Sequence, residues 1–423
     1  MAAIIAFIII FGILVVVHEF GHFYMAKRSG ILVREFSIGM GPKLFATRKN
    51  GTTYTIRWLP LGGYVRMAGM ADDESEIEAG TQATLLLDEQ ETVQKINTSD
   101  KVTTLNGVPF QIAKTDLQKE LWIEGYESGD ESELKRYSVS HDATIVESDG
   151  TEVQIAPVDV QFQSASLINR MLTNFAGPFN NFILAIVAFA LFAFLNGGVP
   201  QNKAIVGTVM PNSPAQKAGL KTDDRLVKVA GKKVTTFTDF SSVIAKYPNK
   251  PVNVQVKRAK QTKSLEITPK AVKVEGQKGK VGQIGVTAGL NHSVGAKLKY
   301  GFTQSWANAT QIFKILGSFL TGGFSLNKLA GPVGMYSMTT QFASQGFTML
   351  VYFLAFLSVN LGIMNLIPIP ALDGGKLVIN VIEAIRGKPI SPEKEGIVTL
   401  VGVGIMVVLM VLVTWNDIQR FFF

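Results

Sequence analysis

Two histidines and a glutamate interrupt a long apolar segment at the start of the chain. The first 17 residues carry no charge, and the motif "HEFGH" (residues 18–22) follows before the segment ends at Lys27-Arg28. An apolar run of this length predicts a transmembrane helix. Because ionisable side chains at membrane depth are costly, they usually mark a functional site. This stretch therefore indicates both a membrane environment and the place to look for chemistry.

His18 and His22 are four residues apart, so a helix places both imidazoles on one face, with Glu19 beside them. This H-E-x-x-H pattern binds zinc through its histidines and uses the glutamate as a general base. A third ligand is also required, and Asp373 is the best candidate. It follows a third apolar segment in "NLIPIPALDGG", where two prolines break the helix. Core histidines and a helix-capping aspartate are the structural alternatives.

The composition agrees with a membrane protein that carries soluble segments. Of the 423 residues 47% are hydrophobic and only 17% are charged, against about 25% charged residues in soluble domains. The net charge of +8 conceals an uneven distribution, since 21 of 33 acidic residues lie between positions 71 and 160. No basic cluster is interleaved with aromatic residues, so we expect no nucleic-acid partner. Without any cysteine the chain has neither disulfides nor thiolate metal sites.

Four apolar segments are long enough to cross a bilayer. We predict a polytopic α-helical membrane protein of about four spans, with a membrane-associated β-hairpin, a small cytoplasmic α+β insert and an extracytoplasmic PDZ-like α+β domain. The expected order is a first span at 1–27, the hairpin at 28–70, the acidic insert at 71–165, a second span at 170–196, the PDZ-like domain at 197–290, an amphipathic helix and linker at 295–346, a third span at 347–386 and a fourth at 395–418.

The orientation follows from the distribution of positive charge. Basic residues are absent before His18 and frequent after the first span, which places that flank in the cytoplasm by the positive-inside rule. We therefore expect a multi-pass protein of the cell membrane whose N-terminus and PDZ-like domain are extracytoplasmic. The HEFGH motif then lies within the bilayer, near its cytoplasmic side.

These motifs resemble the site-2 protease family of intramembrane zinc metalloproteases, in particular its RseP-like branch and the Gram-positive RasP- and Eep-type members. The resemblance also includes "FSIGMGPKLF", "LPLGGYVRM", "NFAGPFNNF" and "LAGPVGM". It implies that His18, His22 and Asp373 bind Zn²⁺ and that Glu19 activates water. It further implies substrate contacts from four positions: Asn365, Asn181, Gly39 and Gly41.

The hairpin predicted over residues 34–67 has a turn signal at Asn50-Gly51. After that turn, Tyr54, Ile56 and Trp58 alternate with polar residues, which predicts one apolar and one polar face. Such a hairpin could offer an edge strand to an unwound substrate, although a purely structural hairpin is the alternative.

The run "SPAQKAGLKTDDRLVKVAGKKV" resembles a bacterial PDZ domain, with Asp223 and Ala230 where the pattern usually has glycine and asparagine. Such a domain could bind a substrate's new C-terminus or exclude bulky ectodomains, and exclusion is the interpretation we favour. The acidic insert suggests no chemistry of its own.

We therefore expect zinc-dependent regulated intramembrane proteolysis of single transmembrane helices. By resemblance, the substrates are anti-sigma factors, signal-peptide remnants and pheromone precursors, already cut outside by a site-1 protease. A membrane metalloprotease of soluble or misfolded segments is one alternative, and a non-catalytic PDZ scaffold or a zinc transporter is another. A transporter should carry polar residues through several spans, and a scaffold would not need Glu19.

Overall fold

The computed structural model describes residues 2–70, 77–127, 133–259, 261–273, 279–323, 325–388 and 390–422. The first residues of the expected acidic insert, 71–76, lie outside this set. The chain forms two compact units, one of Met1–Ala188 with Gln304–Phe423 and one of Phe189–Thr303.

Four helices in the described residues are long and apolar enough to span a membrane: α1 (Ala2–Arg28), α2 (Leu167–Leu195), α7 (Phe347–Asn365) and α9 (Pro392–Phe422). Four such helices are expected from the sequence, but the third ends at Asn365, whereas the third span was expected to continue to residue 386. Many apolar side chains on α1 and α9 are exposed, which suits a lipid environment. The expected amphipathic segment lies in α5 (Val294–Leu320), which is not among these four helices.

Two shorter helices complete the helical part, α6 (Pro332–Ser344) and α8 (Asp373–Arg386), with a 3₁₀ turn at Leu326–Lys328. The N-terminus of α6 is held by Asp417 of α9, whose Oδ2 accepts the backbone N–H groups of Gly331 and Gly334 at 2.8 Å each. A Cβ on either glycine would come within 2.9 Å of that oxygen. The "LAGPVGM" motif is therefore a helix start capped by a buried carboxylate.

Strands β1 (Val33–Lys49) and β2 (Thr52–Met67) form the expected hairpin around Asn50-Gly51. Residues 43–49 pair with 52–57, and residues 33–38 pair with 63–67, while residues 35–38 also lie opposite 53–56. The pair is thus folded into a small sheet in which residues 63–67 form an edge. β1 changes direction at Gly39 and Gly41, whose φ angles are +87° and +83°.

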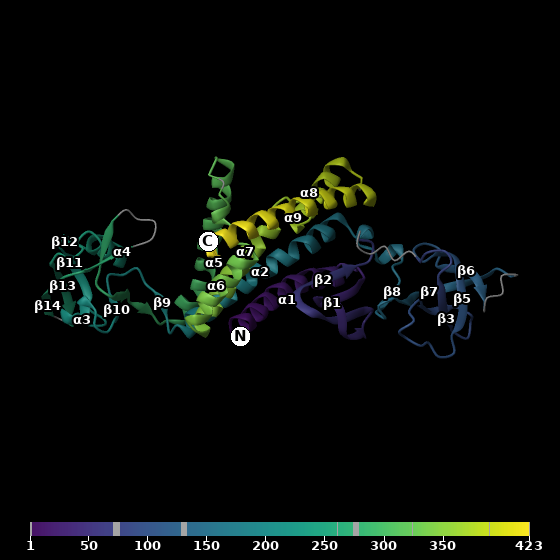
Figure 1. Cartoon of the computed structure of the whole chain (residues 1–423), viewed down its shortest axis with the longest axis horizontal. Coiled ribbons are helices and arrows are strands. Elements are labelled where there is room, and N and C mark those ends of the chain that lie inside the picture. The colour runs from purple at the N-terminus through teal and green to yellow at the C-terminus, as the bar shows by residue number, and fades with distance from the viewer. Residues whose placement is uncertain are drawn as a thin grey trace. The chain divides into compact units, whose positions relative to one another are not determined.

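The acidic insert folds as a small closed sheet, which we call the module (residues 77–160). Its six strands have the order β4-β3-β5-β6-β7-β8, and β4 also pairs with β7. The module is drawn in blue in Figure 1. Its strands are β3 (Gln82–Leu87), β4 (Val93–Asn97), β5 (Val108–Asp116), β6 (Trp122–Glu127), β7 (Lys135–Val146) and β8 (Glu152–Gln154).

The expectation of an α+β insert is wrong for the described part of the module, which contains strands but no α-helix. Two 3₁₀ turns, Val158–Val160 and Phe162–Ser164, lead from it into α2. The reason is visible in the core, where alternate β-branched and aromatic residues of several strands are fully buried, among them Ile96, Phe110 and Ile123.

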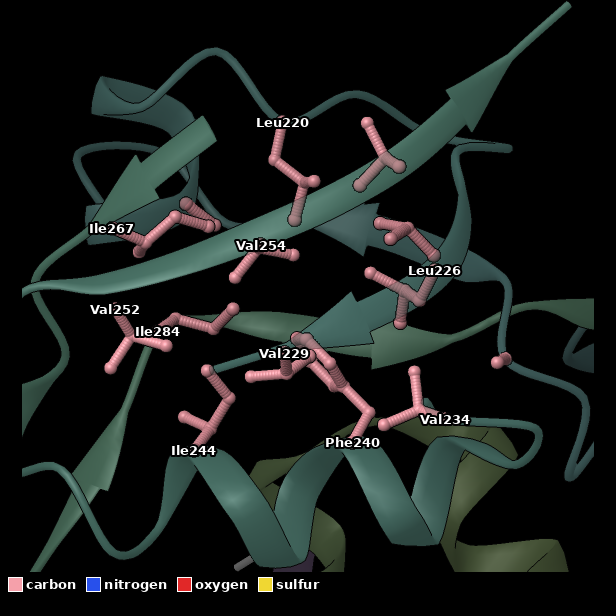
Figure 2. Packing of buried hydrophobic residues seen from close by; sticks show 14 residues of the cluster. Leu220, Leu226, Val229, Val234, Phe240, Ile244, Val252, Val254, Ile267 and Ile284 are labelled. Atoms are coloured by element: carbon pink, nitrogen blue, oxygen red, sulfur yellow. The ribbon is translucent and has the colours of Figure 1, made fainter. Parts of the chain in front are cut away.

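The second unit contains a PDZ-like fold. Its main sheet has the order β12-β11-β13-β14. Its elements are β9 (Val199–Pro200), β10 (Val206–Val209), α3 (Pro214–Lys217), β11 (Arg225–Val229), β12 (Lys232–Lys233), α4 (Phe237–Ile244), β13 (Val252–Arg258), β14 (Gln261–Ile267), β15 (Lys270–Lys273), β16 (Lys280–Gln283), β17 (Val286–Ala288) and β18 (Leu290–Asn291). Figure 2 shows α4 closing a core of aliphatic side chains with Phe240 and Ile244.

Both departures from the PDZ pattern occupy left-handed backbone positions. The φ angle is +67° at Asp223 and +50° at Ala230. Glycine or asparagine adopts this conformation at lower cost, which explains why the pattern favours them there.

The segment "GQIGV" (residues 282–286) contributes to two strands of the domain, since Gly282 lies in β16 and Val286 in β17.

Asp224 is a buried charge that ties this domain together. Its carboxylate accepts hydrogen bonds from Arg258 Nε and Nη2, both at 2.7 Å. Burial alone would raise the pKa of Asp224, but the bonds from Arg258 and from the Lys221 amide outweigh burial and hold the pKa below its usual value.

We predict that this pair makes the domain sensitive to acid. Because the folded pKa of Asp224 is lowered, its stabilisation is complete above the unfolded pKa of about 3.9 and is lost as the pH falls through the folded pKa. Thermal unfolding of residues 198–291 between pH 5 and pH 2.5 should show a steep loss of stability in the wild type and a shallower one in Asp224→Asn. The matched control is Asp223→Asn at the exposed neighbouring residue, which should retain the steep wild-type profile.

Candidate metal centre and active site

The two histidines of the HEFGH motif face a single point from one side of α1. His18 Nε2 and His22 Nε2 are 3.3 Å apart. Both side chains are buried, with relative exposures of 8% for His18 and 6% for His22. One helical turn separates them in sequence, so the helix alone brings the two nitrogen atoms together.

Asp373 reaches the same point from another part of the chain. Helix α7 ends at Asn365, an irregular segment containing both prolines follows, and α8 begins at Asp373. Asp373 Oδ2 lies 3.2 Å from His18 Nε2 and 3.3 Å from His22 Nε2. A carboxylate in the first turn of a helix is also favoured by the helix dipole.

Glycines let this irregular segment fold tightly against α8. A Cβ on Gly374 would lie 2.3 Å from the carbonyl oxygen of Leu366, and one on Gly375 would lie 2.2 Å from that of Ile369. Both glycines are buried. The glycine pair in "LDGG" is therefore required by packing, and it sets where the aspartate begins its helix.

The geometry of these three residues fits a zinc ion. Ligand atoms bound at 2.0–2.1 Å in a tetrahedral arrangement lie roughly 3.3 Å apart, and the three separations here are 3.2, 3.3 and 3.3 Å. Asp373 Oδ2 is buried and has no hydrogen-bond partner in the described residues. Two imidazoles and one carboxylate form a donor set used by catalytic zinc.

Both histidines are oriented by contacts from α2. His22 Nδ1 lies 2.8 Å from the carbonyl oxygen of Thr173, so Nδ1 carries the proton and Nε2 is left with a lone pair. His18 Nδ1 lies 3.0 Å from the side-chain amide of Asn181. Asn181 Oδ1 has no hydrogen-bond partner in the described residues. Turning the amide over lets Oδ1 accept a proton from His18 Nδ1 and frees Nε2 in the same way.

The structure places Asn181 against one of the two histidines. Its side chain is 0% exposed and contacts His18 on the Nδ1 side. Motif resemblance placed Asn181 near the site, but only the packing of α2 against α1 determines which side of the histidine it contacts.

Helices α1, α2 and α7 lie close together (Figure 1). A Cβ on Gly21 of α1 would lie 2.3 Å from the carbonyl oxygen of Ala176, and one on Gly177 of α2 would lie 2.2 Å from His22 Nε2. A Cβ on Gly362 of α7 would lie 3.1 Å from the carbonyl oxygen of Pro178 in α2. Small residues at these crossings bring the polar groups within reach of one another.

A cavity of about 740 Å³ opens beside the three ligand atoms. Glu19 and Asn365 line it, whereas Gly39 and Gly41 do not. Those two glycines instead turn the chain within β1. The remaining lining residues are His18, His22, Tyr64, Val65, Arg66, Met67, Met70, Glu147, Asn174, Ala371, Leu372, Asp373 and Lys376.

Several of these lining residues were not anticipated. Tyr64 and Arg66 belong to "LPLGGYVRM", so the motif marked their segment without giving their position. Lys376 follows Asp373 by one turn of α8, a spacing that would have placed it on the same face. Nothing in the sequence pointed to Glu147, which comes from the module.

We predict that Gly177→Ala removes metal binding. The added methyl group would overlap His22 Nε2 and come within 2.8 Å of His18 Cε1, so the imidazoles could no longer meet Asp373. Zinc content measured by elemental analysis should fall from about one per chain to near zero. Gly12→Ala is the matched control, since a Cβ at that α1 position meets nothing within 4 Å. Full zinc content in Gly177→Ala would contradict the arrangement.

Comparison with known proteins agrees with this site. The model of peptidase family M50 matches residues 6–409. The chain is 56% identical to a probable protease, eep, of Enterococcus faecalis over 100% of both chains. It is 51% identical to a putative zinc metalloprotease of Streptococcus pyogenes over 100% of both chains, and 49% identical to one of Lactococcus lactis over 99% of both.

These matches extend over nearly the whole chain and include both the HEFGH helix and the LDGG segment. The protein is accordingly a zinc-dependent metalloendopeptidase of the membrane, with several spans, and the family to which it belongs acts on membrane-embedded substrates. The chain belongs to peptidase family M50, the site-2 proteases.

Proposed function

We propose that this protein cleaves peptide bonds within single transmembrane helices, with His18, His22 and Asp373 as zinc ligands and Glu19 as the general base. The supporting observation is the meeting of three ligand atoms at 3.2–3.3 Å beside a cavity among apolar helices. By family resemblance the substrates are anti-sigma factors, signal-peptide remnants and pheromone precursors, shortened beforehand by a site-1 protease.

The residues around the cavity have separate roles in the proposed peptide hydrolysis. Zinc held there supplies a Lewis acid that makes water nucleophilic near neutral pH. Glu19 takes the proton from the attacking water and later gives it to the leaving amine. Asn365, at the last position of α7, lines the cavity, and in this proposal its amide donates to the substrate backbone. Lys376 adds a positive charge to the same wall.

The edge strand beside the metal site offers a way to hold an unwound substrate. A helical substrate hides its carbonyl groups, so the chain must extend before it can be cut. Residues 63–67 have strand partners on one side only in the described part of the chain, and Tyr64 to Met67 line the cavity. An extended substrate can add to this edge through backbone hydrogen bonds, which would fix the scissile bond near the zinc.

The hairpin also carries an apolar surface suited to the membrane interface. Several of its large apolar side chains are strongly exposed: Met40, Leu44, Phe45, Ile56, Trp58 and Leu59. An exposed patch of this kind marks a membrane or protein contact. We infer that this apolar end of the hairpin, opposite the Asn50-Gly51 turn, enters the cytoplasmic leaflet beside the active site, in the orientation given by the positive-inside rule. The N-terminus and the PDZ-like domain are then extracytoplasmic, where the domain excludes substrates with large ectodomains.

The central test separates metal binding from proton transfer. We predict that Glu19→Gln, purified in detergent, keeps about one zinc per chain and loses at least a hundredfold in cleavage of a tagged single-span substrate without an ectodomain. Wild-type cleavage mapped by mass spectrometry should fall within the span. Activity of the variant at the wild-type level would exclude Glu19 as the base. Cleavage only of a soluble control polypeptide would support the alternative of a protease for soluble segments.

A second prediction concerns the orientation of His18. Asn181→Leu has a similar volume but cannot accept the Nδ1 proton, so we expect zinc affinity to fall about 10- to 100-fold. The measurement is competition with a zinc chelator at fixed pH. Asn180→Leu is the control, because Asn180 bonds only the Val17 carbonyl in the described contacts and should keep wild-type affinity. Unchanged affinity in Asn181→Leu would contradict a role in orienting His18.

A further inference from the structure

Three basic residues of the hairpin converge on one short turn of the module, between β7 and β8. Arg66 Nη1 lies 2.7 Å from Glu147 Oε1, and Arg57 Nη1 lies 3.6 Å from Asp149 Oδ2. Lys43 Nζ donates to Thr151 Oγ1 at 3.3 Å. These residues come from three different stretches of the hairpin, so residues 147–151 of the module contact it over a broad surface.

The turn is held in a fixed shape by its own hydrogen bonds. The Gly150 amide donates to the Glu147 carbonyl at 2.7 Å, and the Glu147 amide donates to the Thr151 carbonyl at 2.9 Å. Asp149 Oδ1 accepts from the Thr151 amide at 2.6 Å. Gly150 has φ of +82°, a conformation that favours glycine. The acidic side chains are therefore presented in fixed positions.

A buried layer beneath these pairs joins the two parts firmly. Arg34 is 0% exposed and donates from Nε to the Gln154 carbonyl at 2.6 Å, and Thr53 donates to the Glu152 carbonyl. Glu35 is 1% exposed and accepts from Arg57 at 2.8 Å. This pair lies within the hairpin and fixes Arg57, which in turn contacts Asp149 of the module. The module is accordingly docked on the hairpin rather than tethered to it.

The same contacts reach the wall of the active-site cavity. Glu147 of the module and Arg66 of the edge strand both line it, together with Tyr64. Burial raises the pKa of Tyr64 well above its usual value, and Glu35 raises it further. The Arg57 guanidinium lies over the Tyr64 ring at 5.6 Å. The position of the edge strand thus depends on residues tied to the module.

We propose that the module is a positioning element of the protease, and that the Glu147–Arg66 ion pair sets the edge strand, residues 63–67, for substrate binding. This inference rests on the proposed proteolytic function. A shift of about 1 Å in an element that orients substrate can cost about a hundredfold in rate. Glu147 and Arg66 are positioning residues here, since they act through the strand and not on the reacting atoms.

The test is a charge-swap cycle in the full-length protein. Glu147→Arg, Arg66→Glu and the double variant are compared with wild type for kcat and KM on the single-span substrate, for zinc content and for the unfolding midpoint. The matched control reverses Lys135 and Glu127, an ion pair of 2.6 Å between β6 and β7 that does not line the cavity. Each single swap at the cavity should lower kcat/KM roughly 10- to 100-fold, with zinc retained.

The double variant should recover at least part of that loss, whereas the control swaps should leave kcat/KM within about twofold of wild type. Recovery identifies the pair itself, because general damage to the fold would add rather than cancel. Wild-type activity in Glu147→Arg, or no recovery in the double variant, would overturn the inference. If Glu147→Arg fails to fold, Glu147→Gln replaces it and is judged by the same loss of kcat/KM.

Failure of this inference is distinguishable from failure of the proposed function. If wild type cuts within the span and Glu19→Gln does not, the protease assignment stands whatever the charge swaps show. If wild type does not cut within the span, the proposed function fails first, and the charge swaps then have no activity to alter.

Discussion

The meeting of His18, His22 and Asp373 is the contact on which the rest of the membrane part depends. Two imidazoles and a carboxylate buried among apolar helices would be costly without a cation between them. Their separations of 3.2–3.3 Å match the edges of a zinc tetrahedron. Many residues around this site serve to bring the three side-chain atoms together and to hold them in place.

That requirement explains where the small residues stand. Gly21 and Gly177 let α1 and α2 approach until a carbonyl oxygen and an imidazole occupy the space of missing side chains. Gly374 and Gly375 let α8 begin against the irregular segment that follows α7. In lipid, helix association gains little from hydrophobic burial, so it depends on close packing and on polar contacts between the helices. The glycines at these crossings are therefore part of the metal site, although none of them binds the metal.

The candidate metal site could be predicted from the sequence for two reasons: the two histidines are close together in the chain, and few other residues could supply the third ligand. The i, i+4 spacing places both histidines on one helical face, and few acidic residues besides Asp373 lie near a span. The role of Asn181 could not be predicted, because it depends on which face of α2 meets α1. Likewise Glu147 reaches the cavity only through tertiary docking, for which neither spacing nor composition gives a signal.

In the hairpin, the sequence pattern predicts the two faces but not which of them is buried. Alternation predicts its two faces correctly, but a soluble protein would bury the apolar face. Here Thr53 and Thr55 are buried while Ile56 and Trp58 are exposed. On the polar face, Thr53 and Arg57 contact the module, whereas the exposed apolar side chains are the ones that the proposed lipid contact would cover. If the sheet lies between the module and a membrane, as proposed, it must be polar on one side and apolar on the other. The module is then needed to satisfy the hairpin's buried polar groups, which ties its presence to the edge strand that borders the active site.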